Sequence, residues 1–245
     1  RAVKRECEAQ LSQHLFAMGA SASTEFTPLE LDAYESTTGL SPAEILTLHA
    51  KFTALGGERG HFLTKADFTG AAEAGKGRRK SNAGQVGADL KWAPQDKSGD
   101  GVRVPRKEVI EQPEFLLNPF AAQLCAAFTS DESGAGALSF EDYVDLYAAL
   151  SPKASFDTKA RAAFRMYDFD GDGFLSEGDL TILLATLTTP PGAEEPMLKE
   201  GEVRRLVSHV MAEGDVDGNK RLNFTEFERL ARRLPDFSTR FRVFI

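Results

Sequence analysis

The sequence predicts an all-α fold, because helix signals recur along the chain and strand patterns are nearly absent. Two segments, Thr27-Pro28-Leu29-Glu30 and Ser41-Pro42-Ala43-Glu44, have the form of a capping box with proline at the first helical position. The apolar residues after the second box have the spacing of one helical face. They are Ile45, Leu48, Phe52 and Leu55. These signals predict two consecutive helices.

Further helix signals cover much of the remaining chain. Pro113 ends one helix, and Asn118-Pro119 begins another that carries Phe120, Leu124 and Phe128. The predicted helices lie near residues 106–112, 118–128, 139–150, 157–167, 177–187, 201–213 and 224–233. Residues 57–101 are different, since they are largely Gly-rich and polar with little periodicity, and they predict a flexible insertion.

The composition is that of a folded protein with an acidic surface. Of the 245 residues, 42% are hydrophobic and 27% are charged, which excludes wholesale disorder. The 37 acidic residues outnumber 29 Lys and Arg residues, so a nucleic-acid binder is not expected. Two isolated cysteines, Cys7 and Cys125, favour a reducing, cytoplasmic location. No apolar run approaches the ~20 residues that span a bilayer.

Residues 168–179 place three carboxylates at alternate positions within five residues. A like-charged pair at ~4 Å costs about 1 kcal/mol in water and about 4 kcal/mol at an effective dielectric constant of 20. A cation offsets this repulsion, and the spacing is that of the 12-residue EF-hand loop. The predicted ligands are Asp168, Asp170, Asp172, the carbonyl of Phe174, Ser176 through a water molecule, and Asp179.

Other positions of this loop also follow the EF-hand pattern. Gly173 stands at the turn that requires positive φ, and Leu175 stands where paired loops form a short β-bridge. Ser176 is placed to cap the next helix. Asp179 is a departure, since calcium sites usually have a bidentate Glu there. The shorter side chain predicts a site that holds Mg²⁺ well and Ca²⁺ moderately.

Residues 215–226 form a second loop of this kind. The predicted ligands are Asp215, Asp217, Asn219, the carbonyl of Arg221, Asn223 and Glu226. Leu222 takes the bridge position, and Glu226 supplies the bidentate carboxylate. Lys220 replaces the turn glycine and is expected at positive φ, at a cost of about 1 kcal/mol. We expect this loop to bind an ion despite that cost.

Two further segments match the loop only in part. Residues 131–142 keep its general frame, but Ala135 supplies no oxygen at the fifth position. This predicts an ion-free hand with a structural role. In the frame 96–107, Arg103 falls at the bridge position and Lys107 falls where a carboxylate belongs, so no ion is expected there either.

No motif predicts an enzyme. The segment from Gly70 to Lys76 has P-loop spacing, but it lacks the Ser or Thr and the preceding strand. The four histidines are scattered, with no partner at zinc-ligand spacing. No Ser/His/Asp or Cys/His grouping is visible either.

The segment from Met18 to Ser23 matches the pattern for N-myristoylation of Gly19, on the condition that Met18 is the initiator. Myristoylation would place the protein at the membrane periphery. The basic cluster Lys76–Lys80 is either a solvated run or the second signal that stable attachment needs. Residues 1–17 carry no start signal and are predicted to be a disordered extension.

Together these features resemble the calcium- and integrin-binding family of EF-hand adaptors. The segments that carry the resemblance are Met18-Gly19, Leu31–Tyr34, Glu44–Leu46, Asn118–Phe120, Leu138–Asp145, Ala163–Asp170, Pro235–Phe237, Phe241 and the apolar end Val243–Ile245. The resemblance implies four hands, of which only the third and fourth bind ions, and an acylated N-terminus. It also implies that an apolar groove binds amphipathic helices from membrane-protein tails. Lys220 and the insertion depart from the family pattern.

Apolar residues near the two loops are predicted to form this groove. They are Leu180, Leu183, Leu184, Leu187, Leu206, Val210, Met211, Phe227 and Leu230. Phe237, Phe241 and Phe244 make a stripe on residues 235–245, which predicts a terminal helix that fills the groove until a target helix displaces it. Core packing is the alternative explanation for each single residue.

The sequence therefore predicts two lobes of paired EF-hands, over residues 18–150 and 151–234, with residues 235–245 as a lid. The predicted function is that of a Ca²⁺- and Mg²⁺-binding adaptor. Two alternatives stay open. One is a calcineurin-B-type regulatory subunit of a phosphatase, and the other is a constitutive scaffold stapled by Mg²⁺.

Overall fold

The computed structural model describes residues 26–60, 101–131, 136–190, 193 and 195–237. Over these ranges the chain is mostly helical, which confirms the predicted fold class. The helices are α2 (Pro28–Thr38), α3 (Pro42–Ala54), α6 (Arg106–Ile110), α7 (Ala121–Phe128), α8 (Phe140–Leu150), α9 (Phe156–Tyr167), α10 (Glu177–Thr188), α11 (Glu200–Gly214) and α12 (Phe224–Ala231). Two short strands, β1 (Leu175–Ser176) and β2 (Arg221–Leu222), complete the described elements.

Capping boxes start five of these helices. The cap residues are Thr27, Ser41, Ser139, Ser176 and Asn223. In each box the cap side chain accepts a backbone N–H three residues on, and an acidic side chain at that residue accepts the backbone N–H of the cap. Each box satisfies donors that would otherwise lack a partner in the first helical turn. The N-termini of these helices are therefore fixed by local sequence.

Helix α7 begins later than the sequence predicted. The side chain of Asn118 accepts the N–H of Phe120 at 2.9 Å, which makes a turn rather than a helix cap. The helix then starts at Ala121, with no side-chain hydrogen bond at its N-cap. The N-cap is Phe120, so the prediction that Asn118-Pro119 caps this helix is wrong by two residues, about half a turn.

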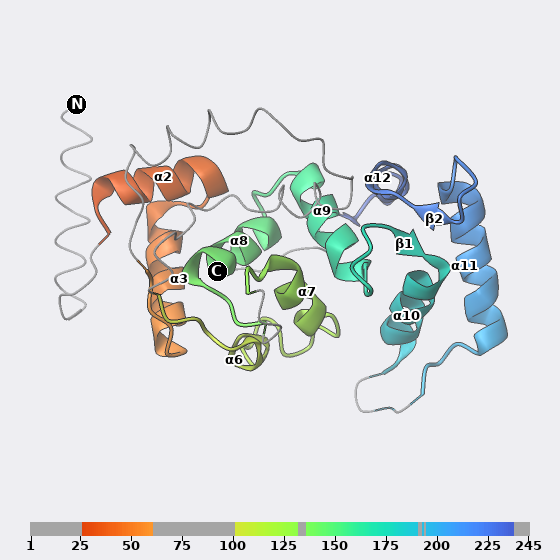
Figure 1. Ribbon diagram of the computed structural model, residues 1–245, viewed down its shortest axis with the longest axis horizontal. Coiled ribbons are helices and arrows are strands. Elements are labelled where there is room, and N and C mark those ends of the chain that lie inside the picture. Colours follow the sequence, from red (N-terminus) through yellow and green to blue (C-terminus); the bar gives the residue numbers. More distant parts are fainter. Residues whose placement is uncertain (1–25, 61–100, 132–135, 191–192, 194, 238–245) are drawn as a thin grey trace.

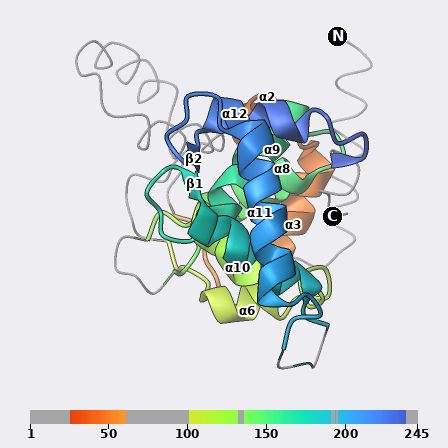
Figure 2. The same ribbon diagram turned by 90° about the vertical axis from the view of Figure 1, so that its right-hand side faces the viewer.

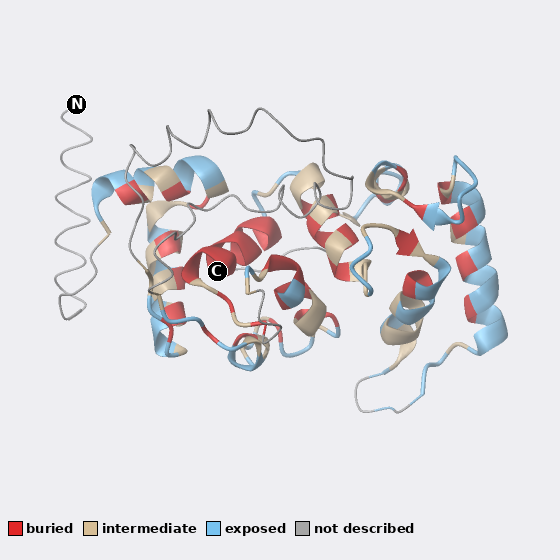
Figure 3. Ribbon diagram, viewed as in Figure 1, coloured by how far each residue is buried: buried red, intermediate tan, exposed pale blue. Residues whose placement is uncertain are grey.

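A first core comprises the buried hydrophobic residues between Tyr34 and Leu150, together with Ala162 and Met166. All 11 residues of α8 are buried within it, and Figure 3 shows this helix as a continuous buried element. The ring of Phe140 lies 5.5 Å from that of Phe52 and 5.9 Å from that of Tyr34. Such edge-to-face contacts add to the stability from area burial alone.

A second, smaller core comprises Phe164, Leu175, Leu180, Val203, Val207, Met211 and Leu222. Helix α9 lies between the two cores (Figure 1), with Ala162 and Met166 in the first core and Phe164 in the second. Helix α10 buries only Asp179 and Leu180. Figure 2 shows α11 across the outer end of the molecule, beside α10. The second core is therefore less completely covered than the first.

Two β-bridges join the loops between helices. Leu175 of β1 pairs antiparallel with Leu222 of β2, as the loop pattern predicted. A second, isolated bridge joins Val104 to Leu138, with N–H to carbonyl distances of 2.9 and 2.8 Å. In the sequence frame 96–107 the bridge position is Arg103, whereas the residue that forms the bridge is Val104, one position later. Among the helices described, none is long and apolar enough to cross a membrane.

Candidate metal centre

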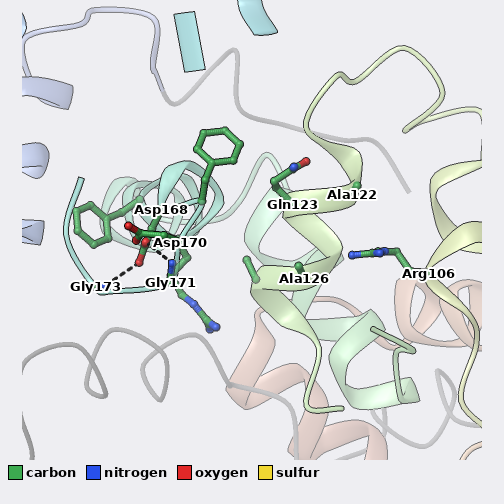
Figure 4. A pocket seen from close by; sticks show the side chains of 12 residues that line it. Arg106, Ala122, Gln123, Ala126, Asp168, Asp170, Gly171 and Gly173 are labelled. Carbon is green, nitrogen blue, oxygen red and sulfur yellow. Dashed lines mark hydrogen bonds between the residues drawn. The ribbon is translucent and has the colours of Figure 1, made fainter. Parts of the chain in front are cut away.

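The 168–179 loop wraps its backbone around the carboxylate of Asp168. One oxygen, Oδ1, accepts the N–H groups of Gly171 at 2.8 Å and Asp172 at 3.1 Å. The other, Oδ2, accepts the N–H of Gly173 at 2.9 Å, and Figure 4 shows the contacts with both glycines. Gly173 has φ of 84°, the left-handed conformation that the sequence predicted for this turn. The loop thus holds its first carboxylate in a fixed position.

Three carboxylates converge in this loop. Asp168, Asp170 and Asp172 each offer an oxygen, and the three oxygens lie within 4.8 Å of one another. Partial burial raises the pKa of the Asp168 carboxyl, and repulsion from Asp172 adds to that effect, so the pKa stays raised although backbone N–H groups oppose it. A cation between these oxygens would favour the charged carboxylates and so offset both effects on the pKa.

Asp179 is not among the converging carboxylates. Its Oδ1 accepts the N–H of Phe169 at 3.1 Å, and its Oδ2 accepts the N–H of Ser176 at 2.8 Å. The Ser176 hydroxyl also donates to Oδ2 at 2.6 Å and caps α10 by accepting the N–H of Asp179 at 3.3 Å. The cap that the sequence predicted for Ser176 is present. The roles of Ser176, Asp179 and the Phe174 carbonyl as ligands stay predictions.

The 215–226 loop repeats the arrangement around Asp215. Its Oδ1 accepts the N–H groups of Gly218 at 2.8 Å and Asn219 at 3.2 Å, and its Oδ2 accepts that of Lys220 at 2.8 Å. Lys220 has φ of 62°, which confirms the predicted left-handed turn at a non-glycine residue. Desolvation raises the pKa of the Asp215 carboxyl, but these N–H groups together outweigh it and lower the pKa below the ordinary value.

Glu226 reaches the carboxylate cluster of this loop. Oxygens of Asp215, Asp217 and Glu226 lie within 4.8 Å of one another, and Glu226 is buried. Its Oε1 accepts the N–H of Val216 at 2.8 Å, and its Oε2 accepts that of Asn223 at 3.0 Å. Asp179 accepts backbone N–H groups at the two equivalent positions but lies outside its cluster. Glu is one methylene longer than Asp, so Glu226 makes these contacts and still reaches the cluster. The Asn223 and Arg221 carbonyl ligands stay predictions.

The donor chemistry of both clusters fits a hard divalent cation. Carboxylate oxygens are the ligands that Ca²⁺ and Mg²⁺ prefer, and neither cluster contains a soft sulfur or imidazole donor. The 168–179 loop would hold an ion through Asp168, Asp170 and Asp172, and the 215–226 loop through Asp215, Asp217 and Glu226. A bound cation would neutralise the crowded charges and fix the two loops.

Arg221 joins the two loops. Its Nη1 lies 3.0 Å from Oδ2 of Asp172, and its backbone pairs with that of Ser176 across the β-bridge. Sequence analysis considered Arg221 only within its own loop and missed this ion pair. The bridge positions of Leu175 and Leu222 contain the signal, because they place Arg221 opposite Ser176 of the other loop.

The 131–142 loop, which the sequence predicts to be ion-free, has a cation of the protein, Arg103, beside its last acidic residue. The guanidinium of Arg103 lies 3.3 Å from Oδ2 of Asp142, a carboxylate with no solvent exposure. The same oxygen accepts the N–H of Ser130 at 2.9 Å and its hydroxyl at 2.8 Å. Ala135, on which the prediction of an ion-free loop depends, lies outside the described residues. Sequence analysis also missed this role of Arg103.

A pocket of about 420 Å³ separates the 168–179 loop from α7. Figure 4 shows Ala122, Gln123 and Ala126 of α7 facing the loop that carries Asp168 and Asp170. This pocket leaves one side of the loop accessible.

The predicted groove residues differ in exposure. Leu180 and Met211 are buried, while Leu183, Leu184, Val210, Phe227 and Leu230 are partly buried against the second core. Leu187 and Leu206 are exposed, at 57% and 42%. The ring of Phe237 lies 5.4 Å from that of Phe156 at the start of α9. Phe241, Phe244 and the lipidation candidate Gly19 lie outside the described residues.

Comparison with known proteins identifies the class of this chain. Residues 157–232 match a family model described as an EF-hand domain pair, which contains both loops. Over 218 residues the chain is 33% identical to "Calcium and integrin-binding family member 2" of Drosophila melanogaster, covering 89% of this chain and 95% of that protein. The protein of that name in Homo sapiens is 33% identical over 220 residues, covering 90% and 96%. The Ovis aries protein is 38% identical over 142 residues, covering 58% and 76%. The chain belongs to the calcium and integrin-binding family.

Proposed function

We propose that this chain is an EF-hand adaptor that binds Ca²⁺ and Mg²⁺ and, near its second core, an amphipathic helix of a target protein. The observation that carries the first part is the pair of converging carboxylate clusters, which the bridge between Leu175 and Leu222 links directly. The names of the relatives, which include the word calcium, support the same conclusion. The role proposed is that of a binding protein and not of an enzyme.

The two loops are proposed to differ in ion preference. In the 215–226 loop, Glu226 supplies the long carboxylate that Ca²⁺ coordination uses. In the 168–179 loop, Asp179 is one methylene shorter and is not among the converging carboxylates, which favours Mg²⁺ with its lower coordination number. Titration calorimetry tests this difference. Tight Ca²⁺ binding at both sites without Mg²⁺ competition contradicts it.

The helix-binding surface is proposed on α10 and α11, which pack against each other. Leu187 and Leu206 are exposed on these helices, beside the partly buried Leu183, Leu184 and Val210. An amphipathic helix would bury its apolar face against these side chains. The target is proposed to be the cytoplasmic segment of a membrane protein, as the family resemblance implies.

Variants at the exposed positions test this surface without disturbing the core. Leu187→Asp and Leu206→Asp should lose the proteins that the chain captures from a detergent extract of membranes. Leu117→Asp is the matched control, because Leu117 is 87% exposed and precedes α7. Removal of the chain from Pro235 onward should increase capture if this segment is a displaceable lid. Equal capture by the wild type and the two α10–α11 variants contradicts the proposal.

The Mg²⁺-stapled scaffold makes a different prediction. An adaptor that responds to Ca²⁺ changes its exposed apolar surface, so ANS fluorescence and amide exchange should differ between Mg²⁺ and Ca²⁺. Identical behaviour in the two ions favours the scaffold. A calcineurin-B-type subunit usually carries four loops that bind ions. Here Arg103 pairs with Asp142, the last acidic residue of the 131–142 loop, so this alternative is the weaker one.

Peripheral membrane attachment is part of the proposal if Met18 is the initiator. Gly19 would then be myristoylated, and the basic cluster Lys76–Lys80 would supply the second signal. Expression from Met18 together with an N-myristoyltransferase tests this by mass spectrometry. The Gly19→Ala variant is the control, and an unmodified wild-type chain contradicts the lipidation.

A further inference from the structure

Arg221 contacts the carboxylate oxygen that an ion in the other loop would need. Asp172 uses Oδ1 to accept the N–H of Phe174 at 2.9 Å, which leaves Oδ2 for a cation. The Nη1 of Arg221 donates to this oxygen at 3.0 Å. The backbone pairing of Arg221 with Ser176 holds the guanidinium on this side of the loops. The cation position beside Asp172 is thus partly filled by the protein itself.

We infer that Arg221 is a tethered competitor of the metal ion in the 168–179 loop, and that it lowers the ion affinity of that loop. The inference rests on the proposed function, since it requires that this loop binds an ion. Without the ion, Arg221 screens the repulsion among the three aspartates and so stabilises the empty loop. With the ion, Asp172 must share its charge, and the guanidinium repels the divalent cation. Both effects weaken binding.

The competition acts in one direction only. The equivalent position in the 168–179 loop is Phe174, whose side chain carries no charge, and the equivalent of Asp172 in the 215–226 loop is the neutral Asn219. The backbone hydrogen bonds are otherwise alike, because the N–H of Arg221 donates to the Asn219 side chain at 2.8 Å. No reciprocal ion pair is available from these two residues. Arg221 therefore lowers the affinity of one loop selectively, although it belongs to the other.

The expected effect is modest because the pair is exposed. The side chains of Arg221 and Asp172 are 52% and 35% exposed. Exposed ion pairs change an equilibrium constant by about fivefold at most, and added salt screens them. Replacing Arg221 by Gln should therefore raise the ion affinity of the 168–179 loop by about two- to fivefold at low salt. The gain should shrink as the salt concentration rises.

Two backbone amides allow each loop to be followed separately. The N–H of Gly173 donates to Asp168 at 2.9 Å, and that of Lys220 donates to Asp215 at 2.8 Å. Each amide resonance in a ¹⁵N spectrum should therefore shift when its own loop binds an ion. The experiment titrates the full chain with Mg²⁺, and then with Ca²⁺, and compares the wild type with Arg221→Gln and Arg221→Lys.

Arg204→Gln serves as the control for charge. Arg204 also forms an exposed ion pair, with Glu200 at 2.6 Å near the start of α11, and its removal changes the net charge equally. Thermal unfolding of every variant without ions checks that the fold is kept.

The inference is supported if the Gly173 midpoint falls about two- to fivefold in Arg221→Gln, with a smaller change at Lys220. The Lys variant should stay close to the wild type. An unchanged Gly173 midpoint in Arg221→Gln overturns the inference alone, as does an equal fall in Arg204→Gln. If neither amide shifts in the wild type at millimolar ion, the proposed function and the inference both fail.

Discussion

The 131–142 loop and the two carboxylate loops solve the same electrostatic problem differently. In each, the acidic residue that ends the loop belongs to a capping box, as Asp142, Asp179 or Glu226. In the 131–142 loop the guanidinium of Arg103 pairs with that residue. In the other two loops, acidic side chains converge instead. The difference suggests a test: if the 131–142 loop is free of ions, as the sequence predicts, the guanidinium of Arg103 supplies the positive charge beside its last acidic residue.

The two cores differ in how completely they bury their helices. The first core buries every residue of α8, whereas α10 in the second buries only two. Apolar burial contributes about 25 cal/mol per Å² to folding, so the first core stabilises its own helices. The second core contains few fully buried side chains. We therefore expect ion binding to matter for α10 to α12 and not for α8.

Removal of divalent ions is the strongest test of this contrast. An ion at 100 times its dissociation constant stabilises the folded state by about 2.7 kcal/mol per site. Amides of α10, α11 and α12 should therefore exchange on the order of 100-fold faster in EDTA, because their helices adjoin the two loops. Amides of α8 should keep their protection. Hydrogen exchange with NMR or mass spectrometry measures both, and uniform loss of protection contradicts the contrast.

Substitutions at the last loop position separate the two kinds of loop. Glu226→Gln removes the charge of a carboxylate in the cluster, so the ion affinity of the 215–226 loop should fall on the order of 100-fold. Asp142→Asn changes the equivalent residue of the 131–142 loop. It should leave ion binding unchanged and lower the free energy of unfolding. Calorimetry with Ca²⁺ and urea unfolding measure the two effects, and a loss of ion binding in Asp142→Asn would count against the distinction.

Arg103→Ala tests whether an internal cation replaces the metal ion. It leaves the Asp142 carboxylate, which has no solvent exposure, without its guanidinium. Loss of a hydrogen bond to a charged group costs about 1–3 kcal/mol. We expect a free energy of unfolding lower by that amount, measured by urea unfolding in EDTA. Arg205→Ala is the control, since Arg205 is an exposed residue of α11. Equal stability of the two variants contradicts the replacement.

Asp179→Glu should make the 168–179 loop more like the 215–226 loop. The extra methylene allows the carboxylate to cap α10 and reach the aspartate cluster, as Glu226 does. We expect the preference for Ca²⁺ over Mg²⁺ to rise about 10-fold in this loop, because Ca²⁺ gains a bidentate ligand. Competition titration of the two ions measures the change. An unchanged preference means that Asp179 does not set selectivity.

The two loops should also release ions at different pH. The pKa of Asp168 is raised by burial and by Asp172, whereas the backbone N–H groups around Asp215 lower its pKa against desolvation. A protonated carboxyl no longer binds the ion as an anion. As pH falls towards the ordinary range of Asp, Asp168 protonates first, so the 168–179 loop should lose its ion at the higher pH. The amide resonances of Gly173 and Lys220 report each loop, and the reverse order contradicts this prediction.

Features that depend on neighbours along the chain were predicted correctly. The positive φ of Gly173 and Lys220 and the cap at Ser176 involve contacts within a few residues. The bridge between Leu175 and Leu222 was also predicted, because the loop pattern fixes its register. The late start of α7 was missed, since an Asn-Pro pair supports a turn as well as a helix cap.

The sequence by itself determined the helical elements, the two acidic loops and the residues at their turns, because helix capping and loop ligation act at short spacings. The tertiary structure alone decided that Arg103 pairs with Asp142, and that Arg221 pairs with Asp172, across separations of 39 and 49 residues. It also decided that Asp179 and Glu226 both accept backbone N–H groups, while only Glu226 reaches its carboxylate cluster. The sequence does not specify which acidic residue pairs with a given arginine, because any two opposite charges attract each other. The pairs form only where folding brings the two side chains together.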